Sequence, residues 1–163
     1  MLFRSALFDA DALNLLSGSG ETRLPANAVI TPHAGEAARL LGISAAQVVE
    51  EPESALVLLH ERCGCHVLLK GARSLMTDGT RCAVNLYGTP ALAKGGSGDI
   101  LTGILAALLA QSQKSLEADE LIRLQAAAAL HGLAGLRAEK AAGENGVTAE
   151  ELISGIRLGS SAL

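Results

Sequence analysis

A glycine-rich turn with one carboxylate stands directly before a long apolar segment. Residues 95–99 read Gly-Gly-Ser-Gly-Asp, and the apolar residues 100–110 that follow are predicted to be helical. The first backbone N–H groups of a helix have no partner within it, and the helix dipole favours an anion there. The turn therefore fits an anion site at the start of this helix. Asp99 would accept a proton from a substrate hydroxyl.

The same five residues also fit a structural role. The turn is not a Walker A loop, because no Gly-Lys-Ser or Gly-Lys-Thr follows, and it lacks the G-x-G-x-x-G spacing. Asp99 would repel a phosphate unless it serves another purpose. A helix N-terminus with glycines for close packing explains the spacing equally well, so the turn alone leaves both interpretations open.

Two other groups of polar residues follow predicted strands. His33 and Glu36, in the segment TPHAGE, stand three residues apart on one face of a predicted helix start. Residues 70–74, Lys-Gly-Ala-Arg-Ser, follow an apolar strand. Because ligands of open α/β sheets bind beyond the carboxyl ends of strands, their two cations suit a nucleotide phosphate. A helix-stabilising first turn and a solvated turn into a hairpin are the structural alternatives.

Other polar residues have simpler expected roles. Asp9 and Asp11 lie at the end of a predicted strand, where paired carboxylates can bind Mg²⁺, although a structural role explains them as well. His131 lies within an alanine-rich helix and is expected to be packed or hydrogen-bonded locally. The three cysteines have the spacing of neither a disulfide framework nor a zinc site, which predicts reduced thiols.

The composition narrows the classes of protein that this chain can belong to. With 163 residues it is long enough for one domain with a hydrophobic core. One Tyr, two Phe, no Trp and a net charge of −4 offer neither the stacking rings nor the basic surface of nucleic-acid binders. The longest apolar run is too short to span a bilayer, and the N-terminus has no signal-peptide pattern. We expect a cytoplasmic protein that binds neither nucleic acid nor membranes.

Three buried strands and a hairpin are expected to position the polar residues. The strands end at Asp9 or Asp11, at Ile30 and at Lys70, so each leads into one of the polar groups described above. The Asp-Gly pair at residues 78–79 stands between two short strand-like segments, which is a hairpin signal.

Helix signals follow these strands. Thr31 is expected to cap a helix with Pro32 at its first position and Gly42 at its end. The remaining predicted helices cover residues 44–62 with a break at Pro52, 99–113, 116–140 and 148–158, and capping boxes Ser44–Gln47 and Thr148–Glu151 open the first and last of these. Strands alternating with helices predict a three-layer α/β/α domain over residues 1–163, with a mostly parallel sheet.

Five motifs, in this order, resemble those of a known family. They are DADALNLL, TPHAGE followed by ARLLG, VLLKGA, GTPALAKGGSGDILTGILAALLAQ and ALHGLAG. The chain resembles the ADP/ATP-dependent NAD(P)H-hydrate dehydratases of the ribokinase-like superfamily from residue 5 to about 158. The resemblance implies repair of the hydrated cofactors NADHX and NADPHX to NADH and NADPH. ADP would be hydrolysed to AMP, as in most bacterial members, or ATP to ADP.

The resemblance also implies roles for individual residues. His33 and Asp99 would contact the hydrate, with Asp99 as the base on its hydroxyl. Lys70, Gly71, Ala72, Arg73, Ser74 and Gly98 would bind the AMP portion, and Gly96, Ser97 and Gly98 would form the anion hole. Mg²⁺ would bridge the nucleotide phosphates without a direct protein ligand. A homo-oligomer, specifically a homotetramer, is implied as well.

Some features depart from the family pattern. Ala34 stands where a proline is usual, and Arg73 and Ser74 stand where a small residue and a Thr are more typical. Family members carry a substantial segment before DADALN, so this sequence would cover a little over half of the family domain and leave an apolar sheet edge. A ribokinase-like kinase for a vitamin precursor or sugar, and a non-catalytic nucleotide-binding fragment, are the alternative functions.

Overall fold

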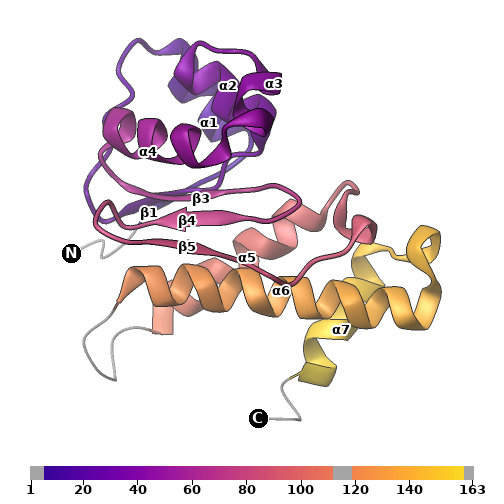
Figure 1. Cartoon of the computed structure of the whole chain (residues 1–163). Coiled ribbons are helices and arrows are strands. Elements are labelled where there is room, and N and C mark those ends of the chain that lie inside the picture. The colour runs from indigo at the N-terminus through magenta and orange to yellow at the C-terminus, as the bar shows by residue number, and fades with distance from the viewer. Residues whose placement is uncertain (1–5, 112–118, 160–163) are drawn as a thin grey trace. The chain divides into compact units, whose positions relative to one another are not determined.

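The computed structural model describes residues 6–111 and 119–159, which belong to two compact units. The first unit comprises Met1–Val84 and the second Asn85–Leu163. Strands are described in the first unit, whereas the described part of the second consists of helices and their connections. In Figure 1 the first unit runs from indigo to magenta and the second from pink to yellow.

A five-stranded sheet with the order β1-β2-β3-β4-β5 organises the first unit. Its strands are β1 (Ala6–Phe8), β2 (Ala28–Ile30), β3 (His66–Leu69), β4 (Leu75–Thr77) and β5 (Cys82–Val84). The first three strands are parallel, and β4 and β5 form the predicted hairpin, antiparallel to β3 and to each other. The register places Phe8 beside Ile30, Ile30 beside Val67, and Val67 beside Thr77. The predicted α/β class with a mostly parallel sheet and one hairpin is therefore confirmed.

Helices cover this sheet and form the core of the first unit. They are α1 (Asp11–Gly18), α2 (Ala34–Leu41), α3 (Ala45–Glu50) and α4 (Pro52–Cys63), which Figure 1 shows gathered on one face of the sheet. Leu13, Leu40 and Leu59 from these helices are buried with Ile30 and Val67 of the strands in one hydrophobic cluster. Full burial of a leucine side chain contributes about 1.5–3 kcal/mol to the free energy of folding. The cluster therefore stabilises the packing of the helices on the strands.

The start of α2 differs from the prediction. Thr31 does not cap the helix and Pro32 is not its first residue, because α2 begins at Ala34 with His33 as its N-cap. Thr31 instead continues the sheet, since its N–H donates to the Phe8 carbonyl at 3.1 Å. The helix ends as predicted at Gly42, whose φ of 72° is the left-handed conformation that favours glycine.

The second unit is built from helices, two of which come into main-chain contact where they cross. Its elements are η1 (Pro90–Leu92), α5 (Ser97–Ala110), α6 (Glu120–Ala142), η3 (Glu144–Gly146) and α7 (Ala149–Gly159). A Cβ atom on Gly155 of α7 would lie 2.5 Å from the carbonyl oxygen of Ala134 on α6, so this crossing requires glycine. The Thr148–Glu151 capping box that opens α7 is confirmed by the bond from the Thr148 N–H to Glu151 Oε2 at 2.9 Å.

Two predicted helix ends fall outside the residues that the structure describes. These are the end of the predicted helix 99–113 at Gln113 and the start of the predicted helix 116–140 at Leu116. The described part of α6 begins after Asp119, whose side chain accepts hydrogen bonds from the N–H groups of Leu121 and Ile122. Among the described residues, no helix has both the length and the apolar character needed to cross a membrane.

Candidate functional site

A small charged network joins the carboxyl ends of the three parallel strands in the first unit. Asp9 follows β1, Glu36 lies in the first turn of α2 after β2, and Lys70 follows β3. The Lys70 ammonium donates to Asp9 Oδ1 at 2.8 Å and lies 3.8 Å from Glu36 Oε2. The two carboxylate side chains are 10% and 6% exposed, so one cation stabilises two nearly buried anions. Asp11 lies in the first turn of α1, where its Oδ1 accepts from the Asn14 amide at 3.5 Å.

His33 is attached to this network through Glu36. His33 Nδ1 accepts hydrogen bonds from the N–H groups of Gly35 and Glu36 at 3.0 and 3.3 Å. In return Glu36 Oε2 accepts from the His33 N–H at 2.8 Å, which completes a capping box. Since Nδ1 is an acceptor, the hydrogen-bond network assigns the ring proton to Nε2, 3.2 Å from Glu36 Oε1. The ring is 54% exposed, so it can contact a ligand while it caps α2.

The predicted nucleotide segment lines a cavity in the same unit. The cavity has a volume of about 530 Å³, within the usual range for small-molecule sites. It is lined by Ala34, Val48, Val49, Pro52, Glu53, Leu69, Lys70, Gly71, Ala72, Arg73, Leu75 and Val84. Four of the five predicted nucleotide residues of this segment are therefore in the lining, and Ser74 is not. Arg73 is exposed, which leaves its guanidinium accessible to a ligand.

Lys70 is held by bonds within the protein, unlike the three exposed residues that follow it. Its ammonium is bonded to Asp9, and its backbone N–H donates to the Pro32 carbonyl at 2.7 Å. A bridge between Lys70 and His33 continues the parallel pairing of β2 and β3. Lys70 thus anchors the start of the turn, while Gly71, Ala72 and Arg73 are exposed beyond it.

The glycine turn of the second unit leads into α5 without a side-chain cap. Gly96 is the N-cap with a φ of 85°, and Ser97, Gly98 and Asp99 are the first helical residues. A Cβ atom on Gly95 would meet nothing within 4 Å, and one on Gly96 would meet only Ala149 Cβ, at 3.8 Å. Ser97 is buried whereas Asp99 is exposed. An uncapped helix N-terminus beside an exposed carboxylate can bind an anion and accept a proton close to it.

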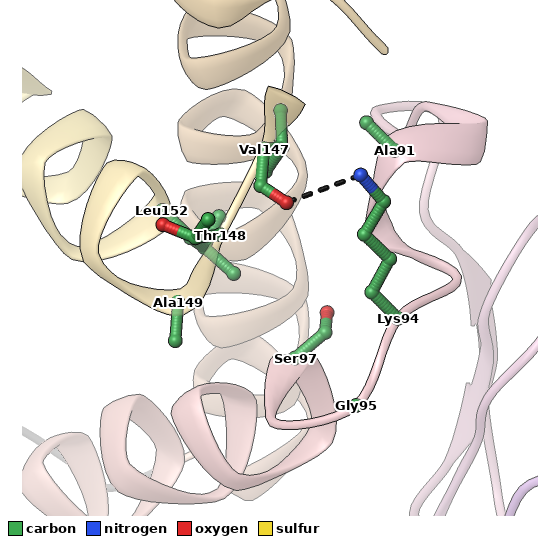
Figure 2. Close-up of a pocket in the computed structure, with 8 residues that line it drawn as sticks. All are labelled: Ala91, Lys94, Gly95, Ser97, Val147, Thr148, Ala149 and Leu152. Carbon is green, nitrogen blue, oxygen red and sulfur yellow. Dashed lines mark hydrogen bonds between the residues drawn. The ribbon is translucent and has the colours of Figure 1, made fainter. Parts of the chain in front are cut away.

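Two residues that the sequence did not connect with this turn have hydrogen bonds at or next to it. His131 of α6 places Nε2 3.0 Å from the Ser97 carbonyl oxygen and 3.1 Å from Ser97 Oγ. His131 is hydrogen-bonded as predicted, but its partner is a residue of α5 and not a local one. The Lys94 ammonium donates to the carbonyl oxygens of Glu144, Asn145 and Val147. Lys94, Gly95 and Ser97 also line a smaller cavity of about 200 Å³, shown in Figure 2. In the sequence, the position of Lys94 beside two glycines could have indicated a role at this turn. Its carbonyl partners could not be predicted, because they lie some fifty residues further along the chain.

The comparisons with known proteins first define the class of protein. The chain is similar to a ribokinase-like superfamily protein from Enterococcus faecalis, with a TM-score of 0.73 and 28% identity over 92% of this chain and 50% of that one. It is also similar in fold to the ADP/ATP-dependent NAD(P)H-hydrate dehydratase from Bacillus subtilis co-crystallized with ATP/Mg²⁺, with a TM-score of 0.81 and 24% identity over 94% and 53% of the two chains. The chain therefore has a ribokinase-like α/β fold.

The family follows from the sequence comparisons. The model of the NAD(P)H-hydrate dehydratase family matches residues 3–158, so the chain belongs to this family. The ADP-dependent (S)-NAD(P)H-hydrate dehydratase of Neisseria meningitidis is 43% identical over 136 residues, which are 80% of this chain and 44% of that protein. The chain spans about half the length of these three proteins.

Proposed function

We propose that the chain serves the ADP-dependent dehydration of (S)-NAD(P)H hydrate, NADHX or NADPHX, to NADH or NADPH with release of AMP and phosphate. The observation that carries this proposal is membership of the dehydratase family across residues 3–158, a range that contains both candidate regions. Each unit is assigned one part of the task. The cavity of the first unit would bind the nucleotide, and the glycine turn of the second would bind an anionic phosphoryl group.

The first unit supports nucleotide binding by the character of its cavity. Val48, Leu75 and Val84 give it an apolar wall that suits a base, and the exposed guanidinium of Arg73 can pair with a phosphate. We assign backbone contacts with AMP or ADP to Gly71, Ala72 and Ser74, and the anchoring of this segment to Lys70. The exposed ring of His33 would contact the hydrate.

The second unit supports phosphoryl transfer by the N-terminus of α5. The N-terminus of α5 at Gly96, Ser97 and Gly98 has no side-chain cap and would stabilise the transferred phosphoryl group, and Gly98 would also contact the nucleotide. Asp99 would take the proton from the hydroxyl group of the hydrate. The oxygen of that hydroxyl would attack the β-phosphorus of ADP, and AMP would leave. The phosphate ester would then leave as inorganic phosphate, with loss of a ring proton, so that the double bond is restored.

Mg²⁺ is expected to bind together with ADP in the proposed reaction. Mg²⁺ is commonly held by substrate phosphates with one or two carboxylates rather than by a protein cage. Among the described residues, no group of three or more His, Cys, Asp or Glu side chains is arranged to hold a metal ion. We assign the ion to the ADP phosphates, where it would neutralise their charge. We also propose that the chain works in the cytoplasm.

Incubation with S-NADHX, ADP and Mg²⁺, followed by the absorbance of NADH, tests the proposed reaction. Asp99→Asn should abolish turnover and leave AMP binding largely intact, whereas Glu150→Gln, an exposed carboxylate of the same unit, should change neither. Equal loss of turnover and AMP binding in Asp99→Asn would indicate a structural role. A phosphorylated product without NADH would favour a small-molecule kinase, and AMP binding without turnover would favour a non-catalytic nucleotide-binding chain.

A further inference from the structure

Lys94 makes three hydrogen bonds with one loop of the second unit. Its ammonium donates to the carbonyl oxygens of Glu144 at 2.9 Å, Asn145 at 2.9 Å and Val147 at 3.1 Å. Figure 2 shows its side chain extended towards the Val147 carbonyl across the smaller cavity. An ammonium group has three N–H donors, so all of them are used within the protein. These bonds tie the turn before α5 to the connection between α6 and α7.

The glycine turn is held at its other end as well. The Ser97 N–H donates to the Lys94 carbonyl at 3.3 Å, which closes the turn, and His131 contacts both the carbonyl and the hydroxyl of Ser97. Gly95 and Gly96 thus lie between two anchors. Glycine loses more conformational freedom than any other residue when it is ordered, so two glycines in an open turn need external restraint to keep one conformation.

We propose that Lys94 is a positioning residue for the anion site at the N-terminus of α5. Its ammonium fixes the glycine turn to the loop at residues 144–147, so that the N–H groups there are oriented before an anion binds. This inference rests on the proposed function of that site. A lysine beside a glycine turn suggests a direct phosphate ligand. Here phosphate contact would require Lys94 to give up bonds with three carbonyl oxygens, which leaves Lys94 a supporting role.

Hydrogen exchange of the ligand-free chain tests the positioning role independently of turnover. In Lys94→Met, backbone amides at residues 95–99 and 144–148 should exchange faster than in the unchanged chain, because both sides of the tie are released. Lys140→Met removes another lysine of the second unit, at the last turn of α6, and should leave these amides unchanged. Unchanged exchange at residues 95–99 in Lys94→Met would overturn the proposal, whether or not the chain proves to be a dehydratase.

Kinetics then separate positioning from direct ligand contact. If dehydration is observed, Lys94→Met should lower kcat by up to about 100-fold, because small displacements of groups that stabilise a transition state are costly. The KM for ADP should change much less. A direct phosphate ligand would instead raise the KM or Kd for ADP strongly and leave exchange in the free chain unaltered, and that outcome would overturn the proposal.

Chemical rescue identifies the ammonium group as the active feature. In Lys94→Ala, added ammonium or methylammonium chloride should slow the exchange of residues 95–99 and restore part of kcat, whereas sodium chloride at equal ionic strength should not. Lys94→Arg should recover less than the native lysine, because a planar guanidinium cannot direct three donors from one point. Full function of Lys94→Ala without added amine would contradict the proposal.

Discussion

At the scale of single residues, two side chains of the first unit combine a structural bond with a surface available to a ligand. Lys70 bonds Asp9 with its ammonium and borders the 530 Å³ cavity. His33 caps α2 with Nδ1 while its ring is half exposed. Substitution of either residue can change both the stability of the fold and the binding of a ligand. The informative variants are those that change only one of these two properties.

Replacement of Lys70 should affect stability first. Lys70→Met leaves Asp9 and Glu36 nearly buried without their cation, which should lower the free energy of unfolding by about 3–5 kcal/mol. Adding Asp9→Asn should recover part of this loss, because one of the two nearly buried carboxylates is then neutral. Urea unfolding measures both effects. Weaker AMP binding by a Lys70→Met chain of normal stability would contradict this assignment and make the ammonium a direct ligand.

Two substitutions of His33 separate capping from ligand contact. Asparagine is among the preferred N-cap residues, so His33→Asn should unfold at nearly the native urea concentration, whereas His33→Ala should lose about 1 kcal/mol. Both should raise the KM for the hydrate if the ring contacts it. If His33→Asn keeps the native KM, the ring acts only as a cap.

At the scale of elements, the β4–β5 hairpin depends on one carboxylate. Asp78 Oδ1 accepts from the N–H groups of Thr80 at 2.9 Å and Arg81 at 2.8 Å, and Oδ2 pairs with the Arg81 guanidinium. Burial by itself would raise the pKa of Asp78, but the hydrogen bonds from Arg81 and Thr80 together hold its pKa well below the usual value. The folded state therefore favours the ionised form.

The sign of the pH dependence follows from this lowered pKa. The stabilisation from Asp78 is complete above its unfolded pKa of about 4 and is lost as the pH falls towards the folded value. Asp78→Asn should cost about 2 kcal/mol at pH 7, with a smaller difference from the native chain at about pH 3. Urea unfolding at both values measures this, with Glu61→Gln as an exposed control. A cost that is equal at both pH values would contradict the proposed ionic role.

Elements with local signals were predictable from the sequence, and those that depend on distant partners were not. The Ser44–Gln47 and Thr148–Glu151 capping boxes are present as predicted, because each is complete within four residues. Thr31 was misassigned because its partner is the Phe8 carbonyl, which only the folded sheet brings near. In the candidate site, too, local features were predictable and contacts with distant residues were not. Its glycine turn and strand ends could be found, but the partners of Lys70 and Lys94 lie far along the chain.

At the scale of the whole molecule, the sheet has a short edge at β1. Within the described residues, β1 pairs only with β2 and has three residues of intermediate exposure. Such an edge presents unpaired backbone groups and favours association. We expect a homo-oligomer, with the homotetramer as the specific expectation, and sedimentation equilibrium over a range of concentrations tests it. A single monomeric species at every concentration would contradict this expectation.

The contact of Gly155 with the Ala134 carbonyl has a consequence for tolerated sequence variation. At this point the crossing of α6 and α7 is set by main-chain atoms, so position 155 is closed to every residue with a Cβ atom. Ile153 on the same helix is exposed, so its substitution by other residue types should change the free energy of unfolding little. A saturation library of α7 should therefore return glycine alone at position 155 and a broad mixture two residues before it.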